Sequence, residues 1–359
     1  MTFAIAAAGT GGHVFPGLAV GEALVAAGVD RTQVLFVGGD RLEATVYPES
    51  GFPFLGVELA GLQRRLSLAN LALPAVVARA VASIGSELAA RRVAVLLGLG
   101  GYVTVPAGLA ARRRGTRLAI AEQNADAGLA NRFMARLAER VFTAFPSTHG
   151  LSAGEWVGNP IRRPLATFER APIRDAARAG FGLTGDSPVV GVFGGSLGAG
   201  AVNAAVASMI ETWRGPPVQF LHLAGRGGPE MKAAARVSPI RWVVLDFCDE
   251  MDHFYAASDL VIARAGGSVA ELTATSTPSI LVPGGFGSGG HQAANARALA
   301  GAGAAVIVTE DEFASLPGVV SSLVTDAERL SAMATACSLL ARPRAAESIA
   351  EALIEMARP

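Results

Sequence analysis

The sequence MTFAIAAAGTGGHVFPGLAVGEAL (Met1–Leu24) joins a short apolar run to a glycine-rich turn and then to an alanine- and leucine-rich segment. The apolar run Thr2–Ala7 predicts a buried parallel strand, and the segment from about Pro16 predicts a helix. Three glycines allow the turn to bend sharply and to bring backbone N–H groups close to a ligand. This strand–turn–helix unit predicts a Rossmann-like α/β domain that binds ligands at the carboxyl ends of its strands.

The same unit recurs along the chain in two series. The remaining strands of the first series are expected at Gln33–Val37, Val93–Leu97, Arg117–Ala121 and Arg140–Thr143. Those of the second are expected at Val189–Phe193, Val218–Leu223, Trp242–Leu245, Leu260–Ala263, Ser279–Val282 and Ala305–Val308. The turn formers and prolines of GNPIRRP (Gly158–Pro164) mark the break between the series. We therefore predict two doubly wound Rossmann-like domains, at residues 1–160 and 161–340. The helical tail Asp326–Ala357 is broken near Pro343, and its last part, 341–359, could pack back on the first domain.

Composition limits the classes of protein to consider. The chain has 359 residues, of which 51% are hydrophobic and 17% charged, so we expect large buried cores. Lys and Arg together number 30, as do Asp and Glu, and this balance argues against a nucleic-acid-binding protein. Cys248 and Cys337 stand outside any CxxC or Cys/His cluster, which indicates reduced thiols and no zinc site or disulfide framework. No signal peptide and no transmembrane helix are expected.

Three further glycine-rich stretches follow expected strands of the second series: Gly194–Gly200, Arg264–Glu271 and Pro283–Asn295. In the first, Ser196 offers a hydroxyl to a phosphate oxygen. In the second, Glu271 falls near a helix start, where the helix dipole favours a carboxylate and where it could also bind a ribose diol. In the third, His291, Gln292 and Asn295 lie on or near one helical face and suit sugar hydroxyls. The alternatives are a tight turn for close helix–strand packing in the first stretch, a carboxylate that only favours the helix start in the second, and a solvated helix start in the third. The residues by themselves leave both interpretations of each stretch open.

His13 stands at the tip of the first glycine-rich turn. A lone histidine is usually structural or solvated, but one on a phosphate-type loop is a candidate acid or base. An ordinary imidazole titrates near pH about 6.5, so it is largely unprotonated at neutral pH and able to accept a proton. The alternative is that His13 only hydrogen-bonds a substrate or a phosphate.

Seven motifs stand in order along nearly the whole chain: GTGGHVFPGLAVGEAL (Gly9–Leu24), LGGYVTVPAGLAA (Leu99–Ala111), EQNADAGLANR (Glu122–Arg132), VGNPIR (Val157–Arg162), FGGSLGA (Phe193–Ala199), FCDEMDHFYAASDLVIARAGGSVAEL (Phe247–Leu272) and HQAANA (His291–Ala296). Together they resemble the MurG family, bacterial N-acetylglucosaminyltransferases of peptidoglycan synthesis. The resemblance implies a GT-B fold, in which two Rossmann-like domains face each other across a cleft.

The resemblance also implies a reaction and a set of site residues. N-acetylglucosamine (GlcNAc) would pass from UDP-GlcNAc to lipid I, undecaprenyl-diphospho-muramoyl-pentapeptide, to form lipid II by a single inverting displacement. His13 would be the catalytic base, with no metal and no cofactor. The donor-binding residues would be Thr10, Gly11, Gly12, Asn124, Arg162, Gly195, Ser196, Cys248, Glu271, Gln292 and Asn295. The acceptor-binding residues would be Gly12, His13, Gly100, Gly101, Tyr102 and Gln123. Cell-wall synthesis proteins are candidate further partners.

Two departures from the family pattern bear on the donor sugar. The family often has two glutamines where this chain has His291-Gln292 after a glycine-rich run, and the loop before Glu271 looks one residue short. Three alternatives therefore stay open. They are another GT-B transferase with a lipid or natural-product acceptor, a UDP-GlcNAc 2-epimerase, and a non-catalytic nucleotide-binding module. Dependence of UDP release on an acceptor separates the transferases from the other two.

Basic and apolar residues lie together in the first domain. Gln63-Arg64-Arg65 leads into the apolar stretch Leu66–Ile84, and Arg112–Arg114 forms a second basic cluster. Apolar surface beside basic residues suits an anionic lipid surface, and this predicts a peripheral protein on the cytoplasmic face of the cell membrane. The alternative is a buried helix with solvated arginines.

Overall fold

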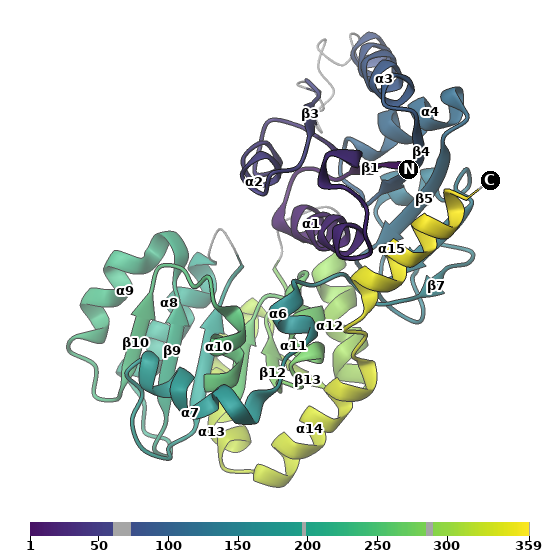
Figure 1. The fold of residues 1–359 in the computed structure, drawn as a ribbon. Coiled ribbons are helices and arrows are strands. Elements are labelled where there is room, and N and C mark those ends of the chain that lie inside the picture. The colour runs from purple at the N-terminus through teal and green to yellow at the C-terminus, as the bar shows by residue number, and fades with distance from the viewer. Residues whose placement is uncertain (60–72, 196–198, 285–289, 359) are drawn as a thin grey trace. The chain divides into compact units, whose positions relative to one another are not determined.

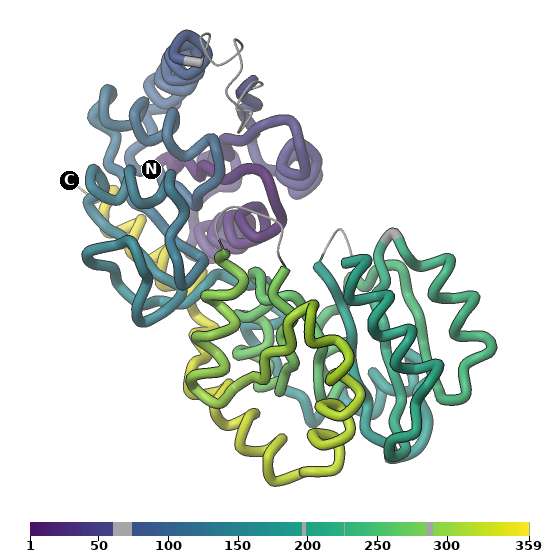
Figure 2. Tube along the Cα trace, turned by 180° about the vertical axis from the view of Figure 1, so that it is seen from behind, coloured from purple at the N-terminus to yellow at the C-terminus, as the bar shows by residue number. Residues whose placement is uncertain are grey.

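The computed structural model describes residues 1–59, 73–195, 199–284 and 290–358 (Figure 1). The chain divides into unit 1, which is Met1–Arg162 with Pro343–Pro359, and unit 2, which is Arg163–Arg342. The last segment of the chain therefore belongs to the unit that contains the first strand (Figure 2). Each unit is built around one parallel sheet.

The sheet of unit 1 has seven parallel strands in the order β3-β2-β1-β4-β5-β6-β7. The strands are β1 (Thr2–Ala6), β2 (Val34–Gly38), β3 (Phe54–Gly56), β4 (Val93–Gly98), β5 (Arg117–Glu122), β6 (Arg140–Thr143) and β7 (Glu155–Trp156). β1 lies in the middle, where Ile5 pairs with Phe36 of β2 and with Leu97 of β4. The carboxyl ends of these strands therefore meet at one edge, which is where a doubly wound sheet binds ligands.

Helices cover both faces of this sheet. They are α1 (Gly11–Ala26), α2 (Glu43–Glu49), α3 (Leu73–Ala90), α4 (Thr104–Arg114), α5 (Leu129–Met134) and α15 (Ala345–Met356), with the short 3-10 helix η1 (Arg31–Gln33). Successive residues of β1 point to opposite faces. Phe3 and Ile5 pack in one apolar cluster with Leu353 of α15, while Ala4 packs in another with Ile84 of α3. Both faces of the sheet are thus buried, which explains the continuous apolar runs in the sequence.

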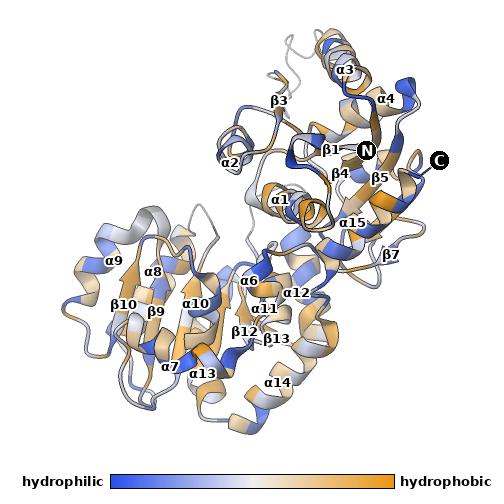
Figure 3. Ribbon diagram, viewed as in Figure 1, coloured by the Kyte–Doolittle hydropathy of each residue, from blue (hydrophilic) through white to orange (hydrophobic). Residues whose placement is uncertain are grey.

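Unit 2 repeats the plan with a six-stranded parallel sheet in the order β10-β9-β8-β11-β12-β13. Its strands are β8 (Val189–Phe193), β9 (Gln219–Leu223), β10 (Trp242–Leu245), β11 (Leu260–Ala263), β12 (Ser279–Leu281) and β13 (Ala305–Ile307). Its helices are α6 (Arg163–Ala166), α7 (Arg170–Gly180), α8 (Gly200–Glu211), η3 (Gly225–Gly227), α9 (Gly228–Ala235), α10 (Met251–Ala257), α11 (Ser268–Ala274), α12 (His291–Gly301), η4 (Glu310–Ser315), α13 (Leu316–Val324) and α14 (Ala327–Leu340). The strands are mostly hydrophobic and the helices alternate polar and apolar residues (Figure 3).

Every predicted strand lies within one residue of an observed strand at each end. The predicted start of the first helix was wrong, because α1 begins at Gly11 rather than near Pro16. Gly11, Gly12 and His13 therefore form the first turn of a helix instead of the preceding loop. The strands β3 and β7 were not predicted, since each has only two or three residues at an edge of the sheet.

Candidate functional site

The loop after β1 carries the first predicted site residues. The backbone turns at Gly9 with a φ of +105°, a conformation that favours glycine. Thr10 is the N-cap of α1, and its hydroxyl lies 3.5 Å from Nδ1 of His13. The backbone N–H of His13 already donates to the carbonyl oxygen of Thr10 at 3.0 Å. The earliest N–H groups of a helix have no partner one turn back, and the helix dipole adds positive potential there. Thr10, Gly11, Gly12 and His13 therefore border a position suited to an anion such as a diphosphate.

The loop after β4 packs directly against this helix start. Gly100 and Gly101 have φ values of +100° and +74°. A Cβ on Gly101 would lie 2.3 Å from the carbonyl oxygen of Ala8, and one on Gly100 would lie 3.0 Å from Nε2 of His13. Glycine is therefore required at both positions by backbone conformation and by close approach. The structure thus brings together His13 and the Gly100–Tyr102 turn, both of which were predicted to bind the acceptor.

Tyr102 is held by a buried carboxylate. Its hydroxyl donates a hydrogen bond to Oε1 of Glu43 at 3.1 Å. Burial, together with the negative charge of Glu43 beside it, raises the pKa of Tyr102 to about 12. The phenol is therefore neutral at any physiological pH and remains a hydrogen-bond donor.

The loop after β5 is organised by Glu122, which is 3% exposed. One carboxylate oxygen accepts from the backbone and side-chain amides of Asn124 at 2.9 and 3.0 Å. The other accepts from the backbone of Gly128 at 3.0 Å and from the side chain of Asn131 at 2.8 Å. Sequence reasoning named Asn124 but missed Glu122 and Asn131. A short polar motif directly after a buried strand was the available signal.

Gln123 lies beside this network and is also buried. Its side-chain amide donates to the carbonyl oxygen of Ala121 at 2.8 Å. Asn131 donates to the same carbonyl at 3.1 Å and lies close to Gly100. The loops after β1, β4 and β5 thus converge at one edge of the sheet of unit 1.

In unit 2 the loop after β8 is described only in part. Gly195 has a φ of +93°, which favours glycine, and α8 begins at Gly200. Ser196, predicted to contact the diphosphate, lies outside the described residues. Cys248 follows β10, where its thiol donates to the carbonyl oxygen of Glu250 at 3.3 Å and burial raises its pKa. Arg162 is the last residue of unit 1 before the chain enters unit 2.

Glu271 lies in the first turn of α11, as the sequence predicted. The hydroxyl of Tyr255 donates to Oε2 of Glu271 at 2.8 Å and so fixes the orientation of the carboxylate. Tyr255 is itself fully buried in α10. A carboxylate held this way at the carboxyl edge of the sheet can accept hydrogen bonds from a diol.

The predicted sugar-binding residues on α12 hold neighbouring loops. The side-chain oxygen of Gln292 accepts from the backbone of Gly284 at 2.8 Å. The side-chain amide of Asn295 donates to the carbonyl oxygen of Ala265 at 3.0 Å, and Asn295 is fully buried. These bonds tie α12 to the loops after β12 and β11. In this structure Asn295 fixes the loop that precedes Glu271.

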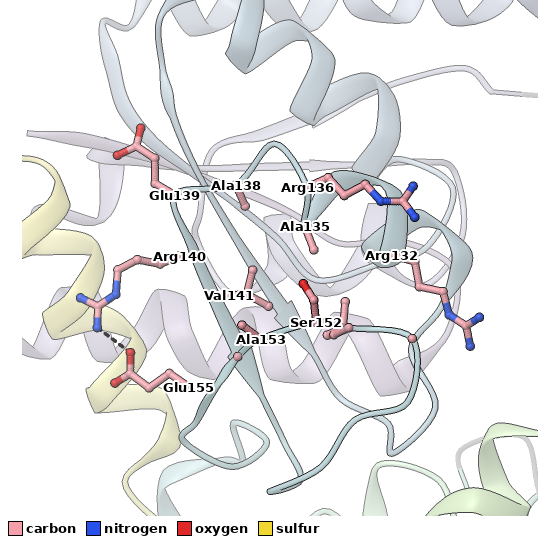
Figure 4. Close-up of a pocket in the computed structure, with 13 residues that line it drawn as sticks. Arg132, Ala135, Arg136, Ala138, Glu139, Arg140, Val141, Ser152, Ala153 and Glu155 are labelled. Carbon is pink, nitrogen blue, oxygen red and sulfur yellow. Dashed lines mark hydrogen bonds and ion pairs between the residues drawn. The ribbon is translucent and has the colours of Figure 1, made fainter.

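An open hollow of about 600 Å³ lies elsewhere on unit 1 (Figure 4). It is lined by Arg132, Ala135, Arg136, Ala138, Glu139, Arg140, Val141 and residues 150–155. The ion pair of Arg140 with Glu155 lies on one side, and Arg132 and Arg136 lie on the other (Figure 4). None of the predicted site residues lines it, so we place the candidate site at the glycine-rich loops.

The predicted apolar membrane segment Leu66–Ile84 falls partly outside the described residues, as do Arg64 and Arg65. In the described part, Val81 and Ile84 of α3 face the core of unit 1, so this part is a buried helix face. Arg112, Arg113 and Arg114 are exposed in the last turn of α4, where the helix dipole stabilises positive charge. None of the described helices is long and apolar enough to span a bilayer. Among the described residues, no three or more acidic, His or Cys side chains cluster in a way that could hold a metal ion.

Comparison with known families identifies both units. Residues 3–143 match the N-terminal domain of glycosyltransferase family 28, and residues 189–349 match its C-terminal domain. The chain belongs to glycosyltransferase family 28. Membership of family 28 confirms the predicted enzyme class, and the two parallel-sheet units confirm the predicted GT-B fold.

Relatives within family 28 align over the whole chain. A protein of Halorhodospira halophila (strain DSM 244 / SL1) is 41% identical over 99% of this chain and 98% of its own length. It is named UDP-N-acetylglucosamine–N-acetylmuramyl-(pentapeptide) pyrophosphoryl-undecaprenol N-acetylglucosamine transferase. A protein of Nocardioides sp. (strain ATCC BAA-499 / JS614) with the same name is 39% identical over 99% of this chain and 98% of its own.

Among solved structures, MurG of Acinetobacter baumannii matches with a TM-score of 0.79, 28% identity and 99% coverage of both chains. A UDP-GlcNAc 2-epimerase of Neisseria meningitidis bound to UDP-GlcNAc matches with a TM-score of 0.67 and 14% identity, covering 99% of this chain and all of that one. The second likeness is one of fold alone, because the sequence identity is low. The likeness to the epimerase therefore adds nothing about activity to the family 28 assignment.

Proposed function

We propose that this protein transfers GlcNAc from UDP-GlcNAc to undecaprenyl-diphospho-muramoyl-pentapeptide and so converts lipid I to lipid II. The observation that carries this proposal is the alignment of the whole chain, at about 40% identity, with transferases of that name. The acceptor would bind to unit 1 and the donor to unit 2.

His13 is the proposed general base on the acceptor side. It lies in the first turn of α1, with Thr10 on one side and Gly100 on the other, which gives the ring a defined place beside backbone N–H groups. A diphosphate bound at the helix start would bring the sugar of the acceptor near the imidazole. The base would take the proton of the attacking C4 hydroxyl as the bond to UDP breaks.

Glu271 is the proposed partner of the ribose on the donor side, because Tyr255 already orients its carboxylate. Gln292 and Asn295 would act on the donor sugar mainly through the loops that they hold. The N-terminus of α8 and Arg162 would neutralise the departing UDP. Gly195 and Ser196 would contact the same diphosphate.

The deciding experiment incubates the protein with UDP-GlcNAc and a lipid I analogue, and measures UDP release and the disaccharide product by mass spectrometry. We expect both, and UDP release only when the acceptor is present. UDP release or a changed sugar without the acceptor would instead favour the 2-epimerase. Binding of UDP-GlcNAc with no turnover under any condition would favour a non-catalytic module.

Two substitutions test the role of His13. His13→Ala should lower kcat by about 10²–10⁴ with little change in UDP-GlcNAc binding, the range expected for a lost general base. His13→Gln can hydrogen-bond but cannot take the proton, so it should be equally impaired. Near-normal kcat in the glutamine variant would make His13 a binding residue.

We also propose that unit 1 meets the membrane surface where the lipid-linked acceptor resides. Arg112–Arg114 supply exposed positive charge, and Leu129 and Phe133 of α5 are exposed apolar residues of the same unit, at 82% and 47%. Sedimentation with anionic vesicles should weaken as salt rises and in an Arg112→Glu/Arg113→Glu variant. Equal sedimentation with neutral and anionic vesicles would contradict an electrostatic contribution.

A further inference from the structure

Glu43 is a fully buried carboxylate that receives three hydrogen bonds from three different loops. Its Oε2 accepts from the backbone of Gly9 at 3.2 Å, in the loop after β1. Its Oε1 accepts from the backbone of Gly39 at 3.0 Å, in the loop after β2, and from the hydroxyl of Tyr102 at 3.1 Å, in the loop after β4. One side chain thus ties together three neighbouring loops at the carboxyl edge of the sheet.

Burial of this carboxylate depends on the arrangement of the loops. An ionised group is costly to remove from water unless hydrogen bonds replace its hydration. Among the described residues no Lys, Arg or His forms an ion pair with Glu43, so the three loop donors replace that hydration. Charge-assisted bonds of this kind are stronger and more directional than neutral ones. The loops hold the carboxylate in place, and the carboxylate holds the loops in register with one another.

Two glycines at the end of β2, Gly38 and Gly39, leave the space that Glu43 and Tyr102 occupy. A Cβ on Gly39 would lie 1.7 Å from the hydroxyl oxygen of Tyr102, and one on Gly38 would lie 2.7 Å from Cγ of Glu43. Both positions must therefore lack a side chain if Glu43 and Tyr102 are to meet. The two glycines at the end of β2 therefore leave space for the Glu43 carboxylate and its bond to Tyr102.

The tied loops are the ones that carry the proposed acceptor-binding residues. Gly9 directly precedes the Thr10–His13 segment, and Tyr102 directly follows Gly100 and Gly101, which pack on His13 and Ala8. We propose that Glu43 is a positioning residue of the acceptor site, which acts by fixing the loops after β1, β2 and β4 relative to one another. The expected effect of Glu43 on acceptor kinetics rests on the proposed function, whereas its expected effect on the conformation of the three loops does not.

Glu43→Gln is the test variant, because an amide cannot satisfy the same three donors. It offers one acceptor oxygen, so at least one of the Gly9 and Gly39 N–H groups must face an NH₂ group. We expect faster backbone hydrogen exchange in segments 8–13, 38–43 and 99–104, with the strands of unit 1 unchanged. We also expect kcat to fall about tenfold to hundredfold and the KM for the lipid acceptor to rise, the scale of a small misplacement of reacting groups. The KM for UDP-GlcNAc should stay at the wild-type value.

Glu22→Gln is the matched control, since it removes an exposed carboxylate of α1 that pairs with Arg31 and lies away from the three loops. It should change neither the exchange of those segments nor the acceptor kinetics. If Glu43→Gln fails to fold, Tyr102→Phe removes only one of the three bonds and should give the same pattern on a smaller scale. Wild-type exchange and acceptor kinetics in the folded variant would overturn the proposal. If wild-type protein itself lacks transferase activity, the proposed function fails and hydrogen exchange alone decides the role of Glu43.

Discussion

Acidification should destabilise unit 2 through one buried imidazole, His222 of β9, which is fully buried. Its Nε2 lies 3.0 Å from the side-chain oxygen of Asn203, whose amide donates to the carbonyl oxygen of Ala224 at 2.9 Å. Because that oxygen is an acceptor, Nε2 must carry the proton. Within the described residues Nδ1 has no hydrogen-bond partner, so a second proton would be buried without an acceptor. Burial lowers the pKa of His222 to about 4.

The sign and size of the effect follow from linkage. The folded pKa is lower than the unfolded value of about 6.5, so the unfolded chain binds a proton that the folded chain does not between pH 6.5 and 4. The contribution to stability is complete above pH about 6.5 and is lost as the pH falls towards 4. A difference of about 2.5 pKa units corresponds to about 3 kcal/mol at 1.36 kcal/mol per unit.

Urea unfolding of the wild type and of His222→Gln at pH 7, 6, 5 and 4 measures this contribution. Tryptophan fluorescence reports mainly on unit 2, which contains Trp213 and Trp242 of the three tryptophans. The variant should be less stable at pH 7, since it lacks the ring that stacks on Trp242. It does not titrate, so the gap between the two proteins should shrink by about 3 kcal/mol between pH 7 and 4. A gap that stays constant across this range would refute the assignment.

Three further substitutions test other parts of the structure. Glu271→Ala should weaken UDP binding, measured by calorimetry, by about 1–3 kcal/mol as the ribose loses its partner, and unchanged affinity would contradict the ribose assignment. Arg170→Met should lower the free energy of unfolding by about 3 kcal/mol, because the partly buried Arg170 guanidinium donates to four backbone carbonyls and to the hydroxyl of Thr277. Urea unfolding measures this loss of stability, and a variant with the midpoint of the wild type would contradict the role of Arg170. Gly39→Ala should lower the melting temperature because its methyl group would overlap Tyr102, and a Tyr102→Ala background should relieve the loss.

The strands could be predicted because parallel strands buried on both faces leave continuous apolar runs, as in Leu260–Ala263. A short edge strand has no continuous apolar run, so Glu155–Trp156 was not predicted. The start of α1 was misplaced because Pro16 resembled a first helical residue, whereas the glycines before it adopt helical geometry. Where a helix starts depends on local contacts, which the spacing of apolar residues in the sequence does not reveal.

The candidate site could be proposed from the sequence where it rests on a local motif, but not where it depends on residues that are distant in the chain. His13 and the Gly100–Tyr102 turn belong to glycine-rich motifs after strands, which short-range chemistry singles out. Glu43 lies 34 residues from Gly9 and 59 from Tyr102, and in sequence it resembles an ordinary solvated glutamate at a helix start. Only the fold brings its partners together.

The return of α15 to unit 1 bears on how the protein is made. Unit 2 is complete once residue 342 has been synthesised, although it comes second in the chain, whereas unit 1 waits for Pro343–Pro359. Until then Ile349 and Leu353 are missing from the cluster that contains Phe3 and Ile5. At typical rates of about 5–20 residues per second, the interval between the synthesis of residue 162 and that of residue 359 is on the order of 10–40 s. A nascent chain therefore carries an uncovered apolar face on unit 1 for that time, and chaperones that recognise such faces should engage unit 1 while unit 2 is still being synthesised.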